Sequence, residues 1–315
     1  MSTCKDENIS VLANFLGFLK KPRLDVENNK IWYVKLFDAV RLWALTFSIG
    51  LIFAFLSSFL LEIFVYDSED FALNQLFEEI SLFLIFVMVV VWAPISEELA
   101  FRLGLKFSPV RWGVGLAMFL FFMVSLLDPP FVVNLLDRLD PSLGFVISLS
   151  FVALLSFFFS LFFNISKVKK VTYDFFQRNF AIFFYTLALI FGLMHITNYT
   201  EDVSTLWLFA PILVMPQILL SFTASFIRVS YGFFWAVFVH ALNNFVAIMM
   251  VILFYPLLEI EAEIGQVSEE ELLANLSVMD FLSISMGVLF FLLAGAIVFF
   301  SIISVLLEFF REKAR

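Results

Sequence analysis

The seven residues SEELAFR, at positions 96–102, place two carboxylates and a guanidinium inside an apolar part of the chain. An uncharged, largely apolar run precedes them from 80 to 95. A charged side chain costs roughly 2.5–3.5 kcal/mol at the centre of a bilayer, so each one needs a partner or a chemical task. The sequence has only two histidines, His195 and His240, and both lie in apolar segments. We therefore expect Glu97 and the two histidines to meet in one intramembrane site.

The composition predicts an all-α polytopic membrane protein. Hydrophobic residues make up 62% of the 315 residues and charged residues only 15%, with a mean hydropathy of +1.00. Soluble domains are about 45–50% apolar and about 25% charged. The single cysteine, Cys4, excludes an intrachain disulfide and a cysteine-based metal cluster. We expect a multi-pass protein of the cell (plasma or inner) membrane, with the lipid bilayer as its surroundings and no nucleic-acid partner.

Apolar runs long enough to cross a membrane recur along the chain. A span needs about 20 residues, and we expect about eight spans, with the third the weakest: 42–65, 79–107, 112–127, 142–165, 180–198, 205–227, 230–256 and 281–308. Basic residues gather in alternate connections, and of the 19 only Arg138 falls in the other set. This alternation predicts that both termini are cytoplasmic. The domains would be a cytoplasmic segment (1–41), the helical bundle (42–310) and a short cytoplasmic tail (311–315).

Within the first segment, five apolar residues recur at helical spacing: Ile9, Leu12, Phe15, Leu16 and Leu19. The basic sequence KKPR follows them at 20–23. This pattern predicts a helix that lies on the membrane surface without crossing it. A solvated tail is the alternative.

The two adjacent glutamates must have different roles. Glu97 and Glu98 point about 100° apart on a helix, whereas Arg102 lies on the same face as Glu98, one turn later. A Glu98–Arg102 ion pair would leave Glu97 free to face an enclosed cavity. Pro94 predicts a distortion of the helix just before this site. The alternative is that the three charges only mark the cytoplasmic end of the helix, with Arg102 reaching the interface.

Two further pairs of residues lie one helical turn apart. Phe191 and His195 form one, and His240 and Asn244 form the other. Each histidine alone is also typical of an interhelical hydrogen bond. Together with Glu97 the set suits peptide hydrolysis, because a carboxylate and a histidine can activate water while a histidine and an amide stabilise the oxyanion. The same groups could instead bind zinc through two histidines and one glutamate, although the sequence has no H-E-x-x-H pair.

The three motifs E-E-x-x-x-R, F-x-x-x-H and H-x-x-x-N, in this order on separate helices, resemble the CPBP (Abi) family. These are intramembrane glutamic endopeptidases related to the type II CAAX-prenyl proteases, and the resemblance covers about 79–253. It implies a helical bundle whose cavity reaches the cytoplasmic side, and metal-free cleavage of a membrane-associated peptide or protein, lipidated or not. By this resemblance Glu97 would activate water with His195, and His240 and Asn244 would form the oxyanion hole. Glu98 and Arg102 would support the site.

The chain departs from the family pattern in spacing. Glu97 and His195 lie 98 positions apart, and two helices at about 112–165 look inserted between them. Counting residues along the expected spans also predicts a mismatch in depth between these two side chains, on the order of 15–20 Å. If they lie far apart, the enzyme hypothesis fails. The rival hypotheses are a non-catalytic scaffold or bacteriocin-immunity factor, a zinc-dependent protease, and a transporter that uses Glu and His as a proton relay.

Overall fold

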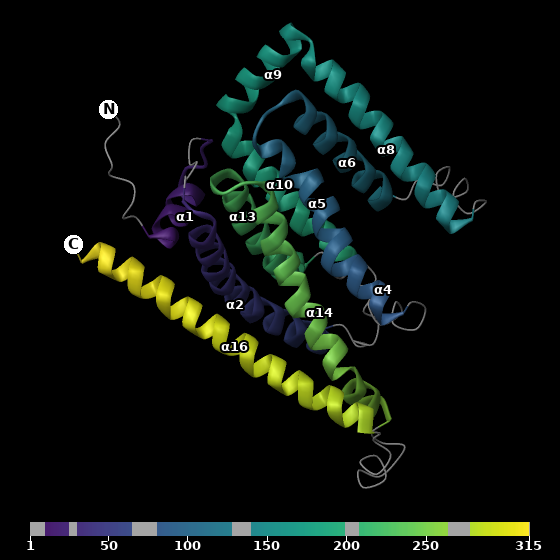
Figure 1. Cartoon of the computed structure of the whole chain (residues 1–315), viewed down its shortest axis with the longest axis vertical. Coiled ribbons are helices and arrows are strands. Elements are labelled where there is room, and N and C mark those ends of the chain that lie inside the picture. Colours follow the sequence, from purple (N-terminus) through teal and green to yellow (C-terminus); the bar gives the residue numbers. More distant parts are fainter. Residues whose placement is uncertain are drawn as a thin grey trace.

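The computed structural model describes residues 10–24, 30–64, 81–127, 140–198, 208–263 and 278–314, and these residues contain helices and no strand. Figure 1 shows the helices as one bundle, with α16 along one side and the α6–α8 pair along another. In chain order the elements are α1 (Val11–Lys20), α2 (Trp32–Phe64), α4 (Leu82–Val87), the π-helical turn η1 (Met88–Trp92), α5 (Ala93–Phe101), the 3-10 turn η2 (Leu103–Leu105), α6 (Pro109–Leu127), α8 (Pro141–Asn164), α9 (Ser166–Arg178), α10 (Phe180–Met194), the 3-10 turn η3 (His195–Asn198), α12 (Ala210–Leu213), α13 (Met215–Ser230), α14 (Phe233–Glu263) and α16 (Val278–Lys313).

Seven of the described helical segments are long and apolar enough to cross a membrane, which confirms an all-α polytopic membrane protein. The expected sixth span at 205–227 is not one continuous helix. It consists of α12 with 4 residues and α13 with 16, separated by Val214. Pro211 and Pro216 lie on either side of this break, and a proline inside a helix removes a main-chain hydrogen bond. α13 packs against α2, α10 and α14, so neighbouring helices cover it on several sides.

The surfaces of α8 and α16 match a lipid environment. Only 6% of the most apolar window of each helix is buried within the protein. Large side chains there point outward, among them Phe157 of α8 and Phe300 of α16, which are 58% and 68% exposed. A soluble protein rarely exposes such continuous apolar surface. In a bilayer this surface contacts acyl chains and not water, so its exposure carries no hydrophobic penalty.

The N-terminal helix has the expected spacing, but it packs on protein. Leu12 and Phe15 are buried, as is Phe18. The Phe15 and Phe18 rings lie 5.4 Å from the ring of Phe226 in α13, and Phe18 lies 5.1 Å from Phe184 in α10. The bundle therefore covers most of this apolar face, and a position of the helix at the membrane surface stays a prediction. Ile9 lies outside the described residues.

The first long helix begins at Trp32, ten residues before the expected boundary at 42. The boundary at 42 was expected because charged residues precede it. In the structure, other side chains of the bundle pair with these charges. Lys30 Nζ lies 2.8 Å from Asp38 Oδ2, and the hydroxyl of Tyr231 donates to the same carboxylate at 2.9 Å. Arg41 pairs with Glu308 of α16. Paired charges cost far less to bury than isolated ones, so the helix extends through them.

The two helices that seemed inserted form a tight pair. α6 and α8 lie side by side (Figure 1), and α6 also packs against α5. Gly113 makes this closeness possible, since a Cβ there would lie 2.5 Å from the main-chain nitrogen of Ser160. The following segment, expected to be a basic loop, is the amphipathic helix α9. At the other end of α8, hydrogen bonds from Ser142 and Leu143 hold the pKa of the capping Asp140 below its usual value.

Candidate active site

A widened helical turn precedes the two glutamates. Pro94 has no N–H to donate one turn back, and the chain forms the π-helical turn η1 just before it, with the Ala93 N–H bonded to the Met88 carbonyl. The carbonyl of Val89 in this turn accepts a hydrogen bond from Asn244 Nδ2 at 2.9 Å. The predicted distortion at Pro94 is therefore present, and it creates a contact between η1 and α14.

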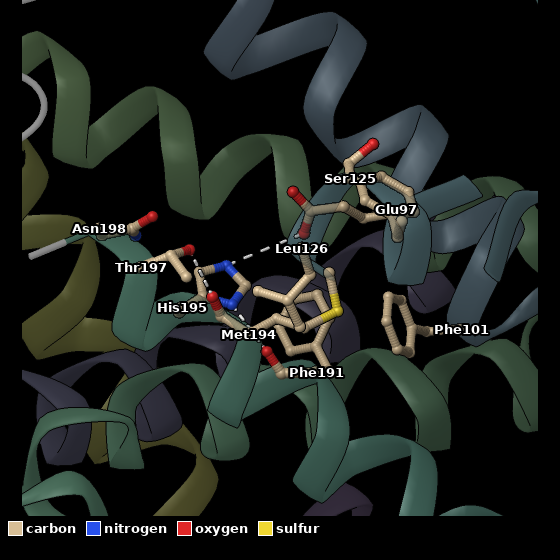
Figure 2. A pocket seen from close by; sticks show the side chains of 10 residues that line it. Glu97, Phe101, Ser125, Leu126, Phe191, Met194, His195, Thr197 and Asn198 are labelled. Atoms are coloured by element: carbon tan, nitrogen blue, oxygen red, sulfur yellow. Dashed lines mark hydrogen bonds and ion pairs between the residues drawn. The ribbon is translucent and has the colours of Figure 1, made fainter. Parts of the chain in front are cut away.

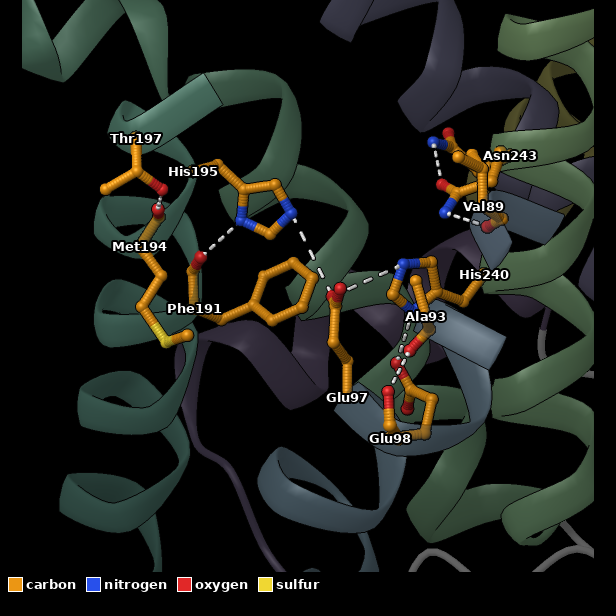
Figure 3. A network of polar contacts seen from close by, with 12 residues as sticks. Val89, Ala93, Glu97, Glu98, Phe191, Met194, His195, Thr197, His240 and Asn243 are labelled. Carbon is orange, nitrogen blue, oxygen red and sulfur yellow. Dashed lines mark hydrogen bonds and ion pairs between the residues drawn. The ribbon is translucent and has the colours of Figure 1, made fainter. Parts of the chain in front are cut away.

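Glu97 lies between the two histidines (Figure 3). Its Oε2 atom is 3.9 Å from His195 Nε2 and 3.7 Å from His240 Nε2. Both separations exceed a direct hydrogen bond. The structure thus brings together the three side chains that sequence reasoning singled out first, from α5, the start of η3 and α14.

Glu98 and Arg102 form the predicted ion pair, and it is completely buried. Arg102 Nη1 lies 3.0 Å from Glu98 Oε1, and both side chains are 0% exposed. The guanidinium also stacks 3.8 Å from the ring centroid of Phe191, a cation–π contact. The alternative that Arg102 reaches the membrane interface is therefore wrong. Phe191 thus contacts the site through its ring.

The hydrogen bonds of the two imidazoles assign their protons. His240 Nδ1 lies 2.9 Å from Glu98 Oε1, and His195 Nδ1 lies 2.7 Å from the Phe191 carbonyl. Both partners are acceptors, so each ring carries a proton on Nδ1. In the neutral rings the Nε2 lone pairs then face the Glu97 carboxylate. Three acceptors that face one another are stable when a proton donor, such as a water molecule, lies among them.

Glu97 and His195 line a cavity of about 300 Å³ (Figure 2). Sequence reasoning missed the other wall, which comes from α6 and includes Phe122, Ser125 and Leu126. His240 and Asn244 are not among the residues that line it. Asn244 was expected to face the reacting atoms, but one of its two amide protons is held by the Val89 carbonyl. Its second amide proton is available to another acceptor.

The expected mismatch in depth is absent, since Glu97 Oε2 lies 3.9 Å from His195 Nε2. The two expected spans are not single straight α-helices, because η1 and η2 interrupt the first and η3 ends the second. The prediction was wrong because a count at 1.5 Å per residue does not give depth along helices interrupted in this way.

Arg228 of α13 is a further buried charge at the site that the sequence did not single out. Its Nε and Nη2 atoms donate to the carbonyls of Arg102 and Leu103, both at 3.1 Å. These carbonyls end α5, where a positive charge also interacts favourably with the helix dipole. Arg228 thereby holds the main chain of Arg102, whose side chain in turn fixes Glu98. In the sequence Arg228 falls between the expected spans 205–227 and 230–256, and such a position predicts an exposed charge in a connection and not a buried one.

The described residues contain no group of three or more His, Cys, Asp or Glu side chains arranged to hold a metal ion. Comparisons with known proteins provide no identification, since no family model, no curated protein and no solved structure matches this chain. The resemblance to the CPBP family therefore stays a prediction based on three short motifs.

Proposed function

We propose that this protein is an intramembrane endopeptidase that uses Glu97 to activate water, without a metal ion. The observation that supports this most directly is the position of Glu97, which lies on a cavity wall beside His195 and within 3.7–3.9 Å of two imidazole nitrogens. The residues behind it are fully buried and paired. Such a rigid support for a partly accessible carboxylate is what general base catalysis requires.

In the proposed reaction, a water molecule in the cavity donates protons toward Glu97 and His195. Glu97 removes one proton as the water oxygen bonds to the scissile carbonyl carbon. The C–N bond then breaks, and the same proton passes to the leaving amine. His240 could donate from Nε2 to the oxyanion only after the neutral ring described above gains a second proton there, while Glu98 holds Nδ1. The second amide proton of Asn244 would serve the same oxyanion.

The substrate would be a membrane-associated peptide or protein, and the cell membrane is the proposed location. The cavity supports this choice because it lies among helices that are long enough to cross a bilayer, and five of its ten lining residues are apolar. The order of the three motifs supports membership of the CPBP (Abi) family. Under that assignment Glu98 and Arg102 support catalysis without touching the substrate.

The first experiment compares the N-terminal peptides of membrane proteins from cells with wild type and with Glu97→Gln at matched expression. Peptides that depend on Glu97 would establish proteolysis and identify the substrate class. Glu312→Gln is the matched control, because this carboxylate accepts from the Ser10 N–H at 2.9 Å and does not line the cavity. Removing a general base lowers the rate by about 10²–10⁴-fold.

Three outcomes contradict the proposal. Identical peptide profiles, with every cellular phenotype retained by Glu97→Gln, would indicate the scaffold or immunity function. Loss of cleavage by the purified protein in the presence of chelator, restored by zinc, would indicate the zinc-dependent version. Substrate flux that follows a pH gradient would indicate a transporter.

A further inference from the structure

Helix α9 joins two of the long apolar helices at one end of the bundle. α8 ends at Asn164 and α10 begins at Phe180, and both are long and apolar enough to span a membrane. α9 has 13 residues, which is about 20 Å of helix, and it contains too many charges to be a span itself. Because it connects two spans, it must lie where the membrane meets water.

One side of α9 anchors it to the protein. Phe176 is buried, and its ring lies 5.3 Å from Trp112 of α6 and 5.5 Å from both Phe180 and Phe183 of α10. Tyr173 contacts Phe107 just before α6 at 5.4 Å. These contacts fix the rotation of α9 about its own axis, so its other faces have defined directions.

A second side of α9 is apolar and uncovered. At 100° per residue, Val168, Val171 and Phe175 point within about 60° of one another. Val171 is 62% exposed and Phe175 is 56% exposed. An amphipathic helix that places such a face beside spanning helices inserts it at the boundary between headgroups and acyl chains.

Lys167 and Arg178 border this apolar face, within about 40° of Val171, whereas Lys169 and Lys170 point about 100° from its nearest member. The one acidic residue of α9 is Asp174. Its four exposed basic side chains are Lys167, Lys169, Lys170 and Arg178. The four make no ion pair with the described residues. Arg111 adds another exposed charge from the start of α6, which α9 contacts through Trp112. This end of the bundle therefore has an excess of positive charge with little acidic compensation from the protein.

We infer that α9 is a membrane-interface helix that binds anionic lipid headgroups. Its apolar face lies among the upper acyl chains, and its lysines contact the negative headgroups. A lipid satisfies both halves of this surface at once, whereas a soluble acidic partner would leave Val171 and Phe175 in water. A basic residue near an anionic membrane contributes about 1 kcal/mol, which is about fivefold in binding. Three lysines together therefore contribute at most roughly 150-fold.

The test uses the full chain reconstituted in phosphatidylcholine mixed with phosphatidylglycerol. The amount of each lipid that remains bound after mild detergent extraction is then measured by mass spectrometry. Wild type should enrich phosphatidylglycerol, and the triple variant Lys167→Gln/Lys169→Gln/Lys170→Gln should lose at least about fivefold of that enrichment. A control with the same charge change is Lys20→Gln/Lys21→Gln/Arg311→Gln, since these residues are also exposed, and it should keep the enrichment.

Insertion is tested separately in a chain whose Cys4 is replaced by serine. Val171→Cys and Lys170→Cys each carry an environment-sensitive fluorophore, and lipids with spin labels on the acyl chain act as quenchers. Quenching should be stronger at 171 than at 170, because these neighbours point about 100° apart. Equal quenching, no lipid enrichment by wild type, or equal loss in the control variant would each overturn the inference. Binding of soluble polyglutamate without lipid enrichment would point instead to an acidic protein partner.

Discussion

The adjacent residues Glu97 and Glu98 should lose very different amounts of stability on the same substitution. Glu98 is 0% exposed, and its Oε1 lies 3.0 Å from Arg102 Nη1 and 2.9 Å from His240 Nδ1. Glu98→Gln keeps the shape but removes the charge that compensates a buried guanidinium. Breaking a buried ion pair in this way costs about 3–5 kcal/mol. The side chain of Glu97 is 17% exposed and lies beyond hydrogen-bond distance of both histidines, so we expect Glu97→Gln to cost about 1 kcal/mol or less.

Thermal unfolding of the purified protein in detergent measures this contrast. At about 2–3 °C per kcal/mol, Glu98→Gln should lower Tm by about 6–15 °C and Glu97→Gln by about 3 °C or less. The double variant Glu98→Gln/Arg102→Met is the control, because removing both charges leaves no uncompensated group, and it should be more stable than Glu98→Gln alone. Equal losses at positions 97 and 98, or a double variant as unstable as the sum of its parts, would refute the assignment of roles.

Two further predictions concern the packing that holds the site. Gly113→Ala should destabilise the protein by about 1–3 kcal/mol, because the new Cβ would lie 2.5 Å from the Ser160 nitrogen. Gly295→Ala is the control: a Cβ there would have nothing within 4 Å, so this variant should be neutral or stabilised by up to about 1 kcal/mol. Thermal unfolding in detergent measures both changes in Tm. Arg228→Gln should cost about 1.5–3 kcal/mol through the lost bonds to the end of α5, and Arg228→Lys should lose less, as chemical denaturation in detergent can measure.

Local sequence rules predicted the chemistry of α5 well. The i,i+4 spacing of Glu98 and Arg102 predicts an ion pair in any helix, and the structure has it. The 100° between neighbours predicts that Glu97 points elsewhere, and it does line a cavity. Pro94 predicts a distortion, although its π-helical form was not foreseen. These inferences succeeded because each depends on a few neighbouring residues of one helix.

Predictions that needed the relative height of two helices failed. Apolar runs do not define where a helix meets water when its charges are paired, as Asp38 and Arg41 are. They also do not reveal the turns η1, η2 and η3, so the depth of His195 could not be counted at 1.5 Å per residue. The packing of the N-terminal helix could not be foreseen for a related reason. An apolar face such as that of Phe15 and Phe18 fits lipid and protein equally well, and only tertiary packing decides between them.

The α6–α8 pair changes how the spacing of the motifs should be understood. An insertion of two helices conserves the direction of the helices that follow, so His195 and Glu97 can still meet. A passive insertion would pack outside the site. Here α6 instead supplies Phe122, Ser125 and Leu126 to the wall of the cavity that contains Glu97. α8 holds α6 in place through the close approach at Gly113 and faces lipid on its outer side. Under the proposed function, the helices between the motifs would therefore belong to the site, because α6 shapes the cavity beside Glu97.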